Sequence, residues 1–352
     1  MPQISLTIDG RKIEAETGMT IRQAAKTAGI EIPHLCNHSQ LSPFAGCRLC
    51  VVEVEKARSL VASCAYPVAE GIVVRTDTER VRKARRLALE LILSDHPLDC
   101  MVCDQAGRCK LQDYAYEMGL SGSRFVGEQH DYPVDASNPF IQRDYSKCIV
   151  CGRCVQVCQE RQVSDAIDLS FRGFDTKVAT QFDRPLQESD CVFCGQCVSV
   201  CPTGALLEKT AVGQGRSWEM ETVRTICPYC GCGCTLELNV KDGKIVKVTS
   251  AKDSTIGTGC LCVKGRFGWD FVYSPERLTT PLIKRNGAFE EATWDEALDL
   301  VARRFGEIKA EHGPDAMATL SSAKCTNEEN YLIQKFTRAV LGTNSVDHCA
   351  RL

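Results

Sequence analysis

The fold of this chain is determined by two cysteine-rich runs, Cys148-Ile-Val-Cys-Gly-Arg-Cys-Val-Gln-Val-Cys158 and Cys191-Val-Phe-Cys-Gly-Gln-Cys-Val-Ser-Val-Cys-Pro202. Both have the spacing C-x2-C-x2-C-x3-C, and a proline ends the second. Three thiolates this close in sequence grip three corners of one [4Fe–4S] cubane, whereas the fourth points away toward a neighbouring cluster. Gly152 and Gly195 occupy matching places, where a missing side chain leaves room beside a cluster. The runs therefore predict a pair of one-electron carriers.

This spacing is the signature of the two-cluster bacterial ferredoxins, in which the fourth cysteine of each run ligates the other cluster. It implies one [4Fe–4S] cluster on Cys148, Cys151, Cys154 and Cys201, and a second on Cys191, Cys194, Cys197 and Cys158. The alternative is a pair of structural zinc ribbons. Zinc sites usually join two short C-x2-C units, whereas here two four-cysteine halves interlock, which favours the clusters.

The composition fits several globular domains without a strong surface charge. The 352 residues carry a formal net charge of −3, so no binding of nucleic acid or of an anionic membrane is expected. No apolar run approaches the length of a membrane span, and the N-terminus lacks a basic signal region, so we expect a cytoplasmic protein. The 23 cysteines lie largely in tight groups, which indicates cluster ligation rather than disulfides. So many thiolate ligands suggest a reducing cell, an anaerobe.

The N-terminal part is predicted to form strand, turn, strand and helix. Residues 3–8 alternate as a half-buried strand, Asp9-Gly10 is a hairpin signal, and residues 11–15 return. A helix is expected over 21–28 after Thr20. This order suggests a ubiquitin-like β-grasp domain. Four cysteines follow with the spacing C-x10-C-x2-C-x13-C, which suits a [2Fe–2S] cluster or a structural zinc ion: Cys36, Cys47, Cys50 and Cys64.

A basic helical run at 77–94 precedes a histidine and three more cysteines. Its basic residues form either a solvated face or a docking face for an acidic partner: Arg80, Arg82, Lys83, Arg85 and Arg86. The next pattern, H-x3-C-x2-C-x5-C, consists of His96, Cys100, Cys103 and Cys109. Both cysteine groups resemble the N-terminal module of the large electron-transfer subunit of respiratory complex I and of iron hydrogenases. The resemblance implies a [2Fe–2S] cluster on the first group and a [4Fe–4S] cluster ligated by the second. The neutral imidazole ligand should raise the potential of that cluster.

A further cysteine group follows residues 208–217, which are a linker by composition. It reads Cys227-Pro-Tyr-Cys-Gly-Cys-Gly-Cys234, and after two expected strands at 235–240 and 244–249 comes Gly259-Cys-Leu-Cys-Val-Lys-Gly265. The spacing C-x2-C-x3-C-x27-C resembles the N-terminal [4Fe–4S] domain of the molybdenum or tungsten bis-pterin oxidoreductases. The implied ligands are Cys227, Cys230, Cys234 and Cys262.

The same resemblance gives Lys264 a role and leaves four cysteines without one. It places Lys264 between the cluster and a pterin, as a buried ammonium that binds the pterin and relays electrons, with a surface lysine as the alternative. The remaining cysteines are expected to be ordinary buried thiols: Cys232, Cys260, Cys325 and Cys349.

Residues 276–352 are predicted to alternate between helix and strand. Capping boxes at Thr293 and Thr326 open helices to about residues 311 and 341, and short strands are expected at 317–321 and from 345. This pattern predicts the opening of a parallel α/β sheet. The run from Gly342 to Leu352 resembles formate dehydrogenase catalytic subunits, in which the next residue is the metal ligand, selenocysteine or cysteine. Cys349 is therefore not expected to be that ligand, and a selenocysteine codon misread as a stop is one explanation of the end, a partial sequence the other.

These motifs predict an α+β multi-domain protein. The expected parts are a β-grasp [2Fe–2S] domain at 1–76, a helix with the histidine-ligated [4Fe–4S] segment at 77–136, a two-[4Fe–4S] ferredoxin domain at 137–210, a small β [4Fe–4S] domain at 218–275 and a truncated α/β molybdopterin domain at 276–352.

The resemblance implies the N-terminal part of a formate dehydrogenase catalytic subunit. Formate would be oxidised to CO2, or CO2 reduced, at a molybdenum or tungsten bis-pterin guanine dinucleotide of the full-length protein. One [2Fe–2S] and four [4Fe–4S] clusters would connect it to a flavin and NAD(P)-binding iron–sulfur subunit or to hydrogenase subunits. The alternative is a non-catalytic electron-transfer subunit like the large iron–sulfur subunit of complex I. Lys264 and the terminal run count against that alternative.

Overall fold

The computed structural model describes residues 2–349 and divides into two compact units. Unit 1 comprises the chain as far as Glu221 with Val240–Val246, and unit 2 comprises Thr222–Asn239 and the chain from Lys247 onward. In the described part of the chain no helix is both long and apolar enough to cross a membrane.

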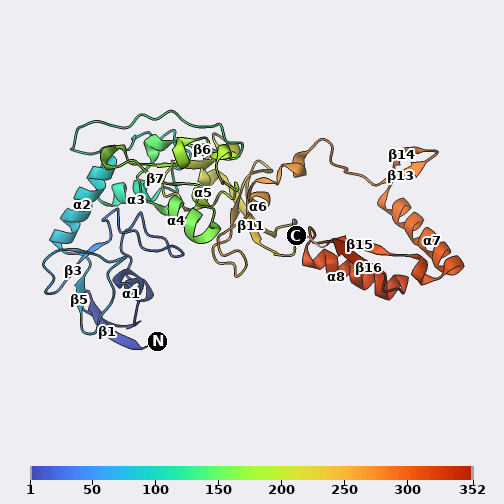
Figure 1. Cartoon of the computed structure of the whole chain (residues 1–352), viewed down its shortest axis with the longest axis horizontal. Helices are drawn as coiled ribbons and strands as arrows, with labels where there is room; N and C mark the ends of the chain where they lie inside the picture. Colours follow the sequence, from blue (N-terminus) through green and yellow to red (C-terminus); the bar gives the residue numbers. More distant parts are fainter. Residues whose placement is uncertain (1, 350–352) are drawn as a thin grey trace. The chain divides into compact units, whose positions relative to one another are not determined.

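Unit 1 opens with the predicted β-grasp arrangement (Figure 1). Its elements are β1 (Gln3–Ile8), β2 (Arg11–Glu16), α1 (Ile21–Thr27), β3 (Val51–Val54), β4 (Val61–Ala62) and β5 (Val73–Arg75). The sheet order is β2-β1-β5-β3-β4, with β1 and β5 parallel. Asp9 and Gly10 both take positive φ in the turn between β1 and β2, as the Asp-Gly pair predicts. Thr20 begins α1 with a capping box, and the helix buries Ile21 against the sheet.

A second core joins the β-grasp loops to two helices, α2 (Glu79–Leu93) and α3 (Lys110–Glu117). Its buried members are Leu35, Leu49, Leu89, Leu93, Cys109, Leu111 and Tyr114. The two cysteine groups predicted in this part of the chain are therefore carried on one hydrophobic core.

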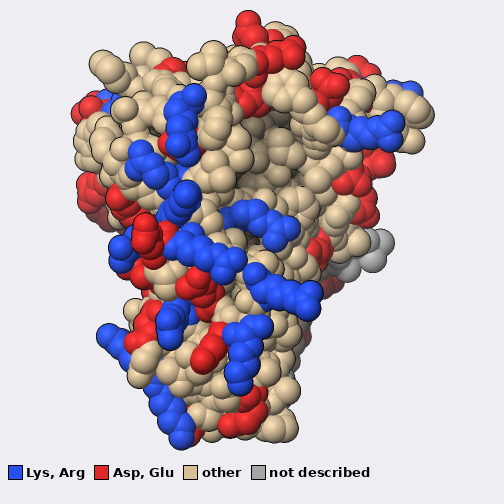
Figure 2. All heavy atoms as spheres, turned by 90° about the vertical axis from the view of Figure 1, so that its left-hand side faces the viewer, with Lys and Arg blue, Asp and Glu red and all other residues tan. Residues whose placement is uncertain are grey.

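The basic run of α2 is only partly a solvated face. Arg85 is buried and donates from Nη2 to the Val51 carbonyl oxygen at 2.9 Å, so it holds the helix to β3. Arg82 pairs with Asp77 at 2.7 Å, and Arg80 lies 3.6 Å from Glu53. Figure 2 shows Lys and Arg side chains interspersed with Asp and Glu over this side of the molecule. The alternation of positive and negative side chains is typical of a solvated surface. The burial of Arg85 corrects the prediction that all five basic residues lie on such a surface.

The ferredoxin segment consists of short elements around two hairpin-like pairs. They are β6 (Ile141–Arg143), η1 (Tyr145–Lys147), α4 (Arg153–Gln156), η2 (Val157–Gln162), β7 (Asp168–Ser170), η3 (Gly173–Asp175), β8 (Lys177–Ala179), η4 (Gln181–Asp183), η5 (Leu186–Glu188), α5 (Gln196–Val200), β9 (Leu206–Glu208), η6 (Lys209–Ala211) and η7 (Ser217–Glu219). β6 pairs antiparallel with β9 and brings the two ends of the segment together. β7 and β8 form the antiparallel pair that lies between the two cysteine runs.

Unit 2 holds most of a three-stranded sheet and the alternating elements that follow it. These elements are β10 (Glu221–Ile226), β11 (Thr235–Lys241), β12 (Lys244–Ser250), α6 (Val263–Phe267), η8 (Asp270–Tyr273), β13 (Leu282–Arg285), β14 (Ala288–Glu291), α7 (Trp294–His312), η9 (Pro314–Ala316), β15 (Thr319–Ser322), α8 (Asn327–Phe336), η10 (Thr337–Leu341) and β16 (Val346–Cys349). Capping boxes begin α7 and α8 at Thr293 and Thr326. β15 and β16 are parallel, as the alternation predicts. Residues 350–352 of the formate-dehydrogenase-like run lie outside the described residues.

Candidate iron–sulfur centres

Two cavities in the ferredoxin segment are lined by the two interlocked cysteine sets. The first is lined by Cys148, Cys151, Cys154 and Cys201, and also by Cys197. The second is lined by Cys158, Cys191, Cys194 and Cys197. Each cavity thus combines three cysteines of one run with the last cysteine of the other. Over residues 2–349, no three His, Cys, Asp or Glu side chains converge to hold a lone metal ion. The thiols surround spaces instead, which fits a cluster core.

The backbone repeats the same arrangement in both runs. The Val150 N–H donates to the Cys148 sulfur at 3.4 Å, and the Phe193 N–H donates to the Cys191 sulfur at 3.4 Å. Gly152 and Gly195 follow with φ of 73° and 67° and begin α4 and α5. A side chain is strained in this left-handed conformation, so glycine suits both places. The N–H groups would stabilise thiolate charge in each half.

Burial makes these thiols poor acids on their own. It raises the pKa of Cys148 to about 11 and that of Cys151 to about 12, and neighbouring cysteines add to the increase. A buried thiolate needs a compensating positive charge. Iron supplies that charge, and a thiol that coordinates it is therefore deprotonated outright. The chemistry of this donor set therefore fits iron–sulfur clusters.

The four N-terminal cysteines also lie together, on loops of the β-grasp domain. The Leu35 N–H donates to the Cys47 sulfur at 3.4 Å, and the Cys47 N–H donates to the Cys36 sulfur at 3.5 Å. Hydrogen bonds from the thiols of Cys47 and Cys64 lower the pKa of Cys36 to about 2. A hydrogen bond from Cys64 likewise lowers the pKa of Cys50 to about 6. Four thiols in mutual contact can supply the two thiolates per iron of a [2Fe–2S] cluster.

The environment of His96 suits a metal ligand. Its Nδ1 is buried and has no hydrogen-bond partner among the described residues. Burial lowers the pKa of His96 and so favours the neutral imidazole that binds metals. Burial also raises the pKa of Cys100 and Cys109, and Cys103 contributes to both increases through its charge. The structure thus brings the three predicted cysteines together, and the charges of Asp99 and Lys147 act on both His96 and Cys100. Ligation by His96 stays a prediction.

The loop that carries Cys103 is held by residues that the sequence indicated were a linker. Arg216 donates from Nη1 to the Cys103 carbonyl oxygen at 2.6 Å and from Nη2 to the Met101 carbonyl oxygen. The Gly213 N–H donates to Asp104 Oδ1 at 2.9 Å. Residues 208–217 are therefore a latch on this loop rather than a free connection. No local pattern could have identified Arg216, because its partners lie more than a hundred residues earlier.

Unit 2 gathers its four predicted ligands around the start of α6. The Cys227 N–H donates to the Cys234 carbonyl oxygen at 2.9 Å. Burial raises the pKa of Cys227, with contributions from Cys262, Cys230 and Cys232. A Cβ added at Gly265 would lie 3.6 Å from the Cys227 sulfur, so α6 packs closely against the group. Cys232 belongs to the same cluster of thiols, since its sulfur lies 3.4 Å from that of Cys234.

Two expectations about unit 2 are wrong. Lys264 is exposed, because the inward side of α6 is occupied by Gly265, Arg266 and Phe267. The residues of the structure therefore do not bury its ammonium group. The cysteines without a ligand role are not buried either: Cys232 and Cys349 are exposed, and Cys260 and Cys325 are half-buried.

The first ferredoxin cavity lies between the other two groups of unit 1. On one side, the Ser42 N–H donates to Glu160 Oε2 at 2.9 Å and Gln156 Nε2 donates to the Ser42 carbonyl oxygen at 2.8 Å. These contacts place the loop after Cys36 against α4 and η2. On the other side, Lys147 pairs with Asp99 at 3.0 Å and so links the loop of the histidine group to the residue before Cys148.

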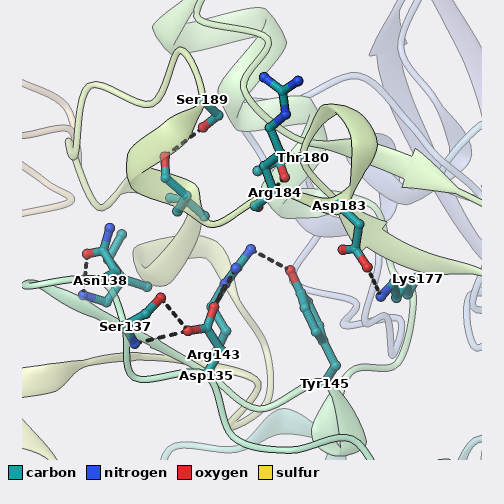
Figure 3. A network of polar contacts seen from close by, with 12 residues as sticks. Asp135, Ser137, Asn138, Arg143, Tyr145, Lys177, Thr180, Asp183, Arg184 and Ser189 are labelled. Atoms are coloured by element: carbon teal, nitrogen blue, oxygen red, sulfur yellow. Dashed lines mark hydrogen bonds and ion pairs between the residues drawn. The ribbon is translucent and has the colours of Figure 1, made fainter.

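A partly buried ion pair stabilises the wall of the first cavity (Figure 3). Arg143 and Tyr145 both line this cavity. Arg143 donates from Nε to Asp135 Oδ2 at 2.9 Å and from Nη1 to the Tyr145 hydroxyl oxygen at 3.0 Å. Burial raises the pKa of Asp135, but hydrogen bonds from Ser137 and Arg143 outweigh it and lower the pKa to about 2. Asp135 is therefore a carboxylate at neutral pH.

Five family models match successive parts of the chain. They are a 2Fe-2S iron-sulfur cluster binding domain at 1–79, the NADH-ubiquinone oxidoreductase-G iron-sulfur binding region at 85–124, a 4Fe-4S dicluster domain at 147–205, the molybdopterin oxidoreductase Fe4S4 domain at 220–274 and molybdopterin oxidoreductase at 277–352. They confirm the fold class predicted from the motifs.

Several curated proteins are similar over 99% of the chain. "Putative formate dehydrogenase YrhE" of Bacillus subtilis (strain 168) is 38% identical over 390 residues. The NADPH-Fe(3+) oxidoreductase subunit alpha of Geobacter sulfurreducens is 40% identical over 349 residues, and a subunit of the NADH-quinone oxidoreductase of Rhizobium meliloti is 39% identical over 351. The chain spans about 40% of the length of each of these relatives. A crystal structure of an NAD+-reducing [NiFe]-hydrogenase in the H2-reduced state aligns with a TM-score of 0.57 and 31% identity, over 61% of this chain and 91% of that chain.

Proposed function

Because the chain belongs to the molybdopterin oxidoreductase family and carries 2Fe-2S and 4Fe-4S domains ahead of the molybdopterin domain, we propose that it is the N-terminal part of a formate dehydrogenase catalytic subunit. The reaction converts formate to CO2, one proton and two electrons, or runs in reverse. One observation supports the proposal: matches to cluster domains and to a molybdopterin domain occur in one chain, and relatives named as putative formate dehydrogenases match over 98–99% of it.

We further propose the five clusters and the domain boundaries predicted from the motifs. When bound, the clusters supply one-electron carriers between the pterin centre and a partner. The residues of the chain hold them: cysteine thiolates and His96 ligate iron, and backbone N–H groups such as that of Val150 stabilise the thiolates. Lys264, exposed on α6, remains available to contact a pterin.

The proposed partners follow from the relatives' names. An NAD+-reducing hydrogenase structure is similar over 61% of this chain, and relatives named as NADPH-Fe(3+) and NADH-quinone oxidoreductase subunits are similar over 99% of it. These likenesses support our proposal of a flavin and NAD(P)-binding iron–sulfur subunit or hydrogenase subunits as acceptor. Because a reducing compartment preserves free thiolates, we place the protein in the cytoplasm.

A non-catalytic electron-transfer subunit is the second candidate. It is favoured by the 39% identity to a protein named as part of an NADH-quinone oxidoreductase, over the same 99% of the chain. Such a protein would carry the clusters of unit 1 but neither bind molybdenum or tungsten nor react with formate.

Metal analysis of the native full-length protein, purified without oxygen, separates the two functions. Stoichiometric molybdenum or tungsten with pterin, and bleaching of the clusters by formate, would support the formate dehydrogenase. Iron without either metal, and clusters reduced by NAD(P)H but not by formate, would support the electron-transfer subunit.

A lysine variant tests the role proposed for α6. Lys264→Met should retain iron and molybdenum or tungsten and yet slow formate-dependent cluster reduction, while reduction by NAD(P)H stays unchanged. Lys244→Met, on an equally exposed lysine of β12, is the matched control and should change neither rate. Equal rates in Lys264→Met and the control would remove Lys264 from the proposed site.

A further inference from the structure

Arg153 is a charged residue at a position where the second cysteine run has a neutral one. It lies between Cys151 and Cys154, where the second run has Gln196 between Cys194 and Cys197. Within the two runs, from Cys148 to Cys158 and from Cys191 to Cys201, this is the only position at which the two sequences differ in charge. Arg153 begins α4, and its side chain is half-buried.

The guanidinium group of Arg153 connects the segments of two different centres. It donates from Nη2 to the Asn37 carbonyl oxygen at 2.5 Å and from Nη1 to the Val200 carbonyl oxygen at 3.2 Å. Asn37 follows Cys36 of the proposed [2Fe–2S] centre, and Val200 precedes Cys201 of the first [4Fe–4S] centre. The planar fork of an arginine can hold two such acceptors at once.

Proposed ligands are the charged groups that act most strongly on Arg153. The groups that act on it through their charge are Cys151 and Cys201 of one centre and Cys36 and Cys47 of the other. Its Nε is buried and has no hydrogen-bond partner among residues 2–349. An arginine normally neutralises its charge with a carboxylate or a phosphate. Cysteines of two proposed centres thus act on this one cation.

Neighbouring contacts keep the two segments in place around Arg153. The ring of Phe44 packs against Gly152, where an added Cβ would lie 3.2 Å from three ring carbons. Arg22 donates to the Asn37 side-chain oxygen at 2.8 Å and so orients the carbonyl group that Arg153 binds. The cation therefore sits in a defined junction.

We propose that Arg153 is a positioning residue shared by the [2Fe–2S] centre of Cys36 and the [4Fe–4S] centre of Cys148, and that its charge raises the reduction potentials of both. Each centre gains negative charge when it takes up an electron, and a nearby buried cation offsets that gain. The inference rests on the cluster assignment of the proposed function and is independent of the substrate.

The test is a dithionite titration of the full-length protein, followed by electron paramagnetic resonance of each cluster. Arg153→Gln gives the first run the residue of the second and removes the charge. We expect the reduction potentials of both centres to fall. The fall should change the ratio of reduced to oxidised cluster at least tenfold, which corresponds to about 59 mV for one electron. For the other three clusters, the ratio of reduced to oxidised cluster should change less than threefold.

Two further variants separate charge from a general effect. Arg153→Lys keeps the charge. In this variant the ratio of reduced to oxidised cluster should stay within threefold of the wild-type ratio for both centres. Arg161→Gln removes an exposed arginine of η2, the element that follows α4 in the chain, and should shift neither potential. If Arg153→Gln fails to retain iron, the lysine variant decides the question. An Arg153→Lys protein that keeps its iron and both reduction potentials supports the proposal. Loss of iron, or a tenfold change in the ratio of reduced to oxidised cluster, overturns it.

The outcomes distinguish this inference from the proposed function. A fully loaded Arg153→Gln protein with unchanged potentials would overturn the role of Arg153 alone, as would an equal shift in Arg161→Gln. A wild-type protein without these two clusters would overturn the cluster assignment itself.

Discussion

Gly204 offers a sharp test of whether Cys103 ligates a cluster. Gly204 is buried, and its backbone lies outside the left-handed region, so alanine can adopt the same conformation. A Cβ at this position would lie 2.8 Å from the Cys103 sulfur, well inside the 3.4–4 Å of ordinary van der Waals contact. A free thiol could rotate away from the added methyl group at little cost. A thiolate bound to iron could not.

The expected size of the effect follows from that overlap. Forcing an extra methyl group against a fixed neighbour costs about 1–3 kcal/mol. Since each 1.4 kcal/mol is tenfold, Gly204→Ala should weaken retention of the histidine-ligated cluster by roughly 5- to 150-fold. Iron and acid-labile sulfide analysis with electron paramagnetic resonance should then show loss of that one [4Fe–4S] signal, while the remaining clusters persist.

The control is Gly127→Ala, at an exposed glycine with no atom within 4 Å of an added Cβ. It should keep every cluster. A Gly204→Ala protein with full iron content and an unchanged signal would show that Cys103 moves freely, and this would remove it from the ligand set.

Three other predictions follow from the core and the ferredoxin segment. Cys201→Ser should alter the spectrum and potential of the cluster held by the first cysteine run, and Cys158→Ser should alter those of the cluster held by the second, as measured by electron paramagnetic resonance. If each variant instead affected the cluster of its own run, the interlocked ligand sets would be wrong. Leu89→Ala, which empties a fully buried position of the second core, should lower the free energy of unfolding by about 2–5 kcal/mol in denaturant titrations, whereas the exposed Leu91→Ala should change it little. Asp135→Asn should destabilise the protein by about 1 kcal/mol at neutral pH. Because its folded pKa of about 2 lies below the ordinary value of 3.8, this stabilisation is complete above pH 3.8 and is lost as the pH falls toward 2, so the difference between variant and wild type should close over that window.

Local signals predicted most of the secondary structure. The Asp-Gly turn of the first hairpin and the capping boxes at Thr293 and Thr326 act within four residues, and the structure has each of them. Cysteine spacing also acts locally, since three ligands of each set lie within a few residues. The family models confirm the classes of cluster domain that this spacing predicted.

Contacts over long sequence distances were not predictable in the same way. Arg216 resembles any linker residue, and only the folded chain shows that it binds the Cys103 loop. Arg85 belongs to a run of similar basic residues, and its burial depends on where β3 packs. Lys264 was expected to be buried because of its motif, but α6 turns three other residues inward. Each difference arises from tertiary packing that no periodicity encodes.

The latch formed by Arg216 also has a consequence for biogenesis. Its hydrogen bond to the Cys103 carbonyl oxygen joins residues that are 113 positions apart. During synthesis the N-terminal part of a chain emerges and folds first. All four proposed ligands of the histidine centre therefore leave the ribosome before Arg216 can bind their loop, and we expect the loop to close only after the whole ferredoxin segment has been made. This interval gives the machinery that delivers iron and sulfide a period of access to the loop, which ends when residue 216 emerges.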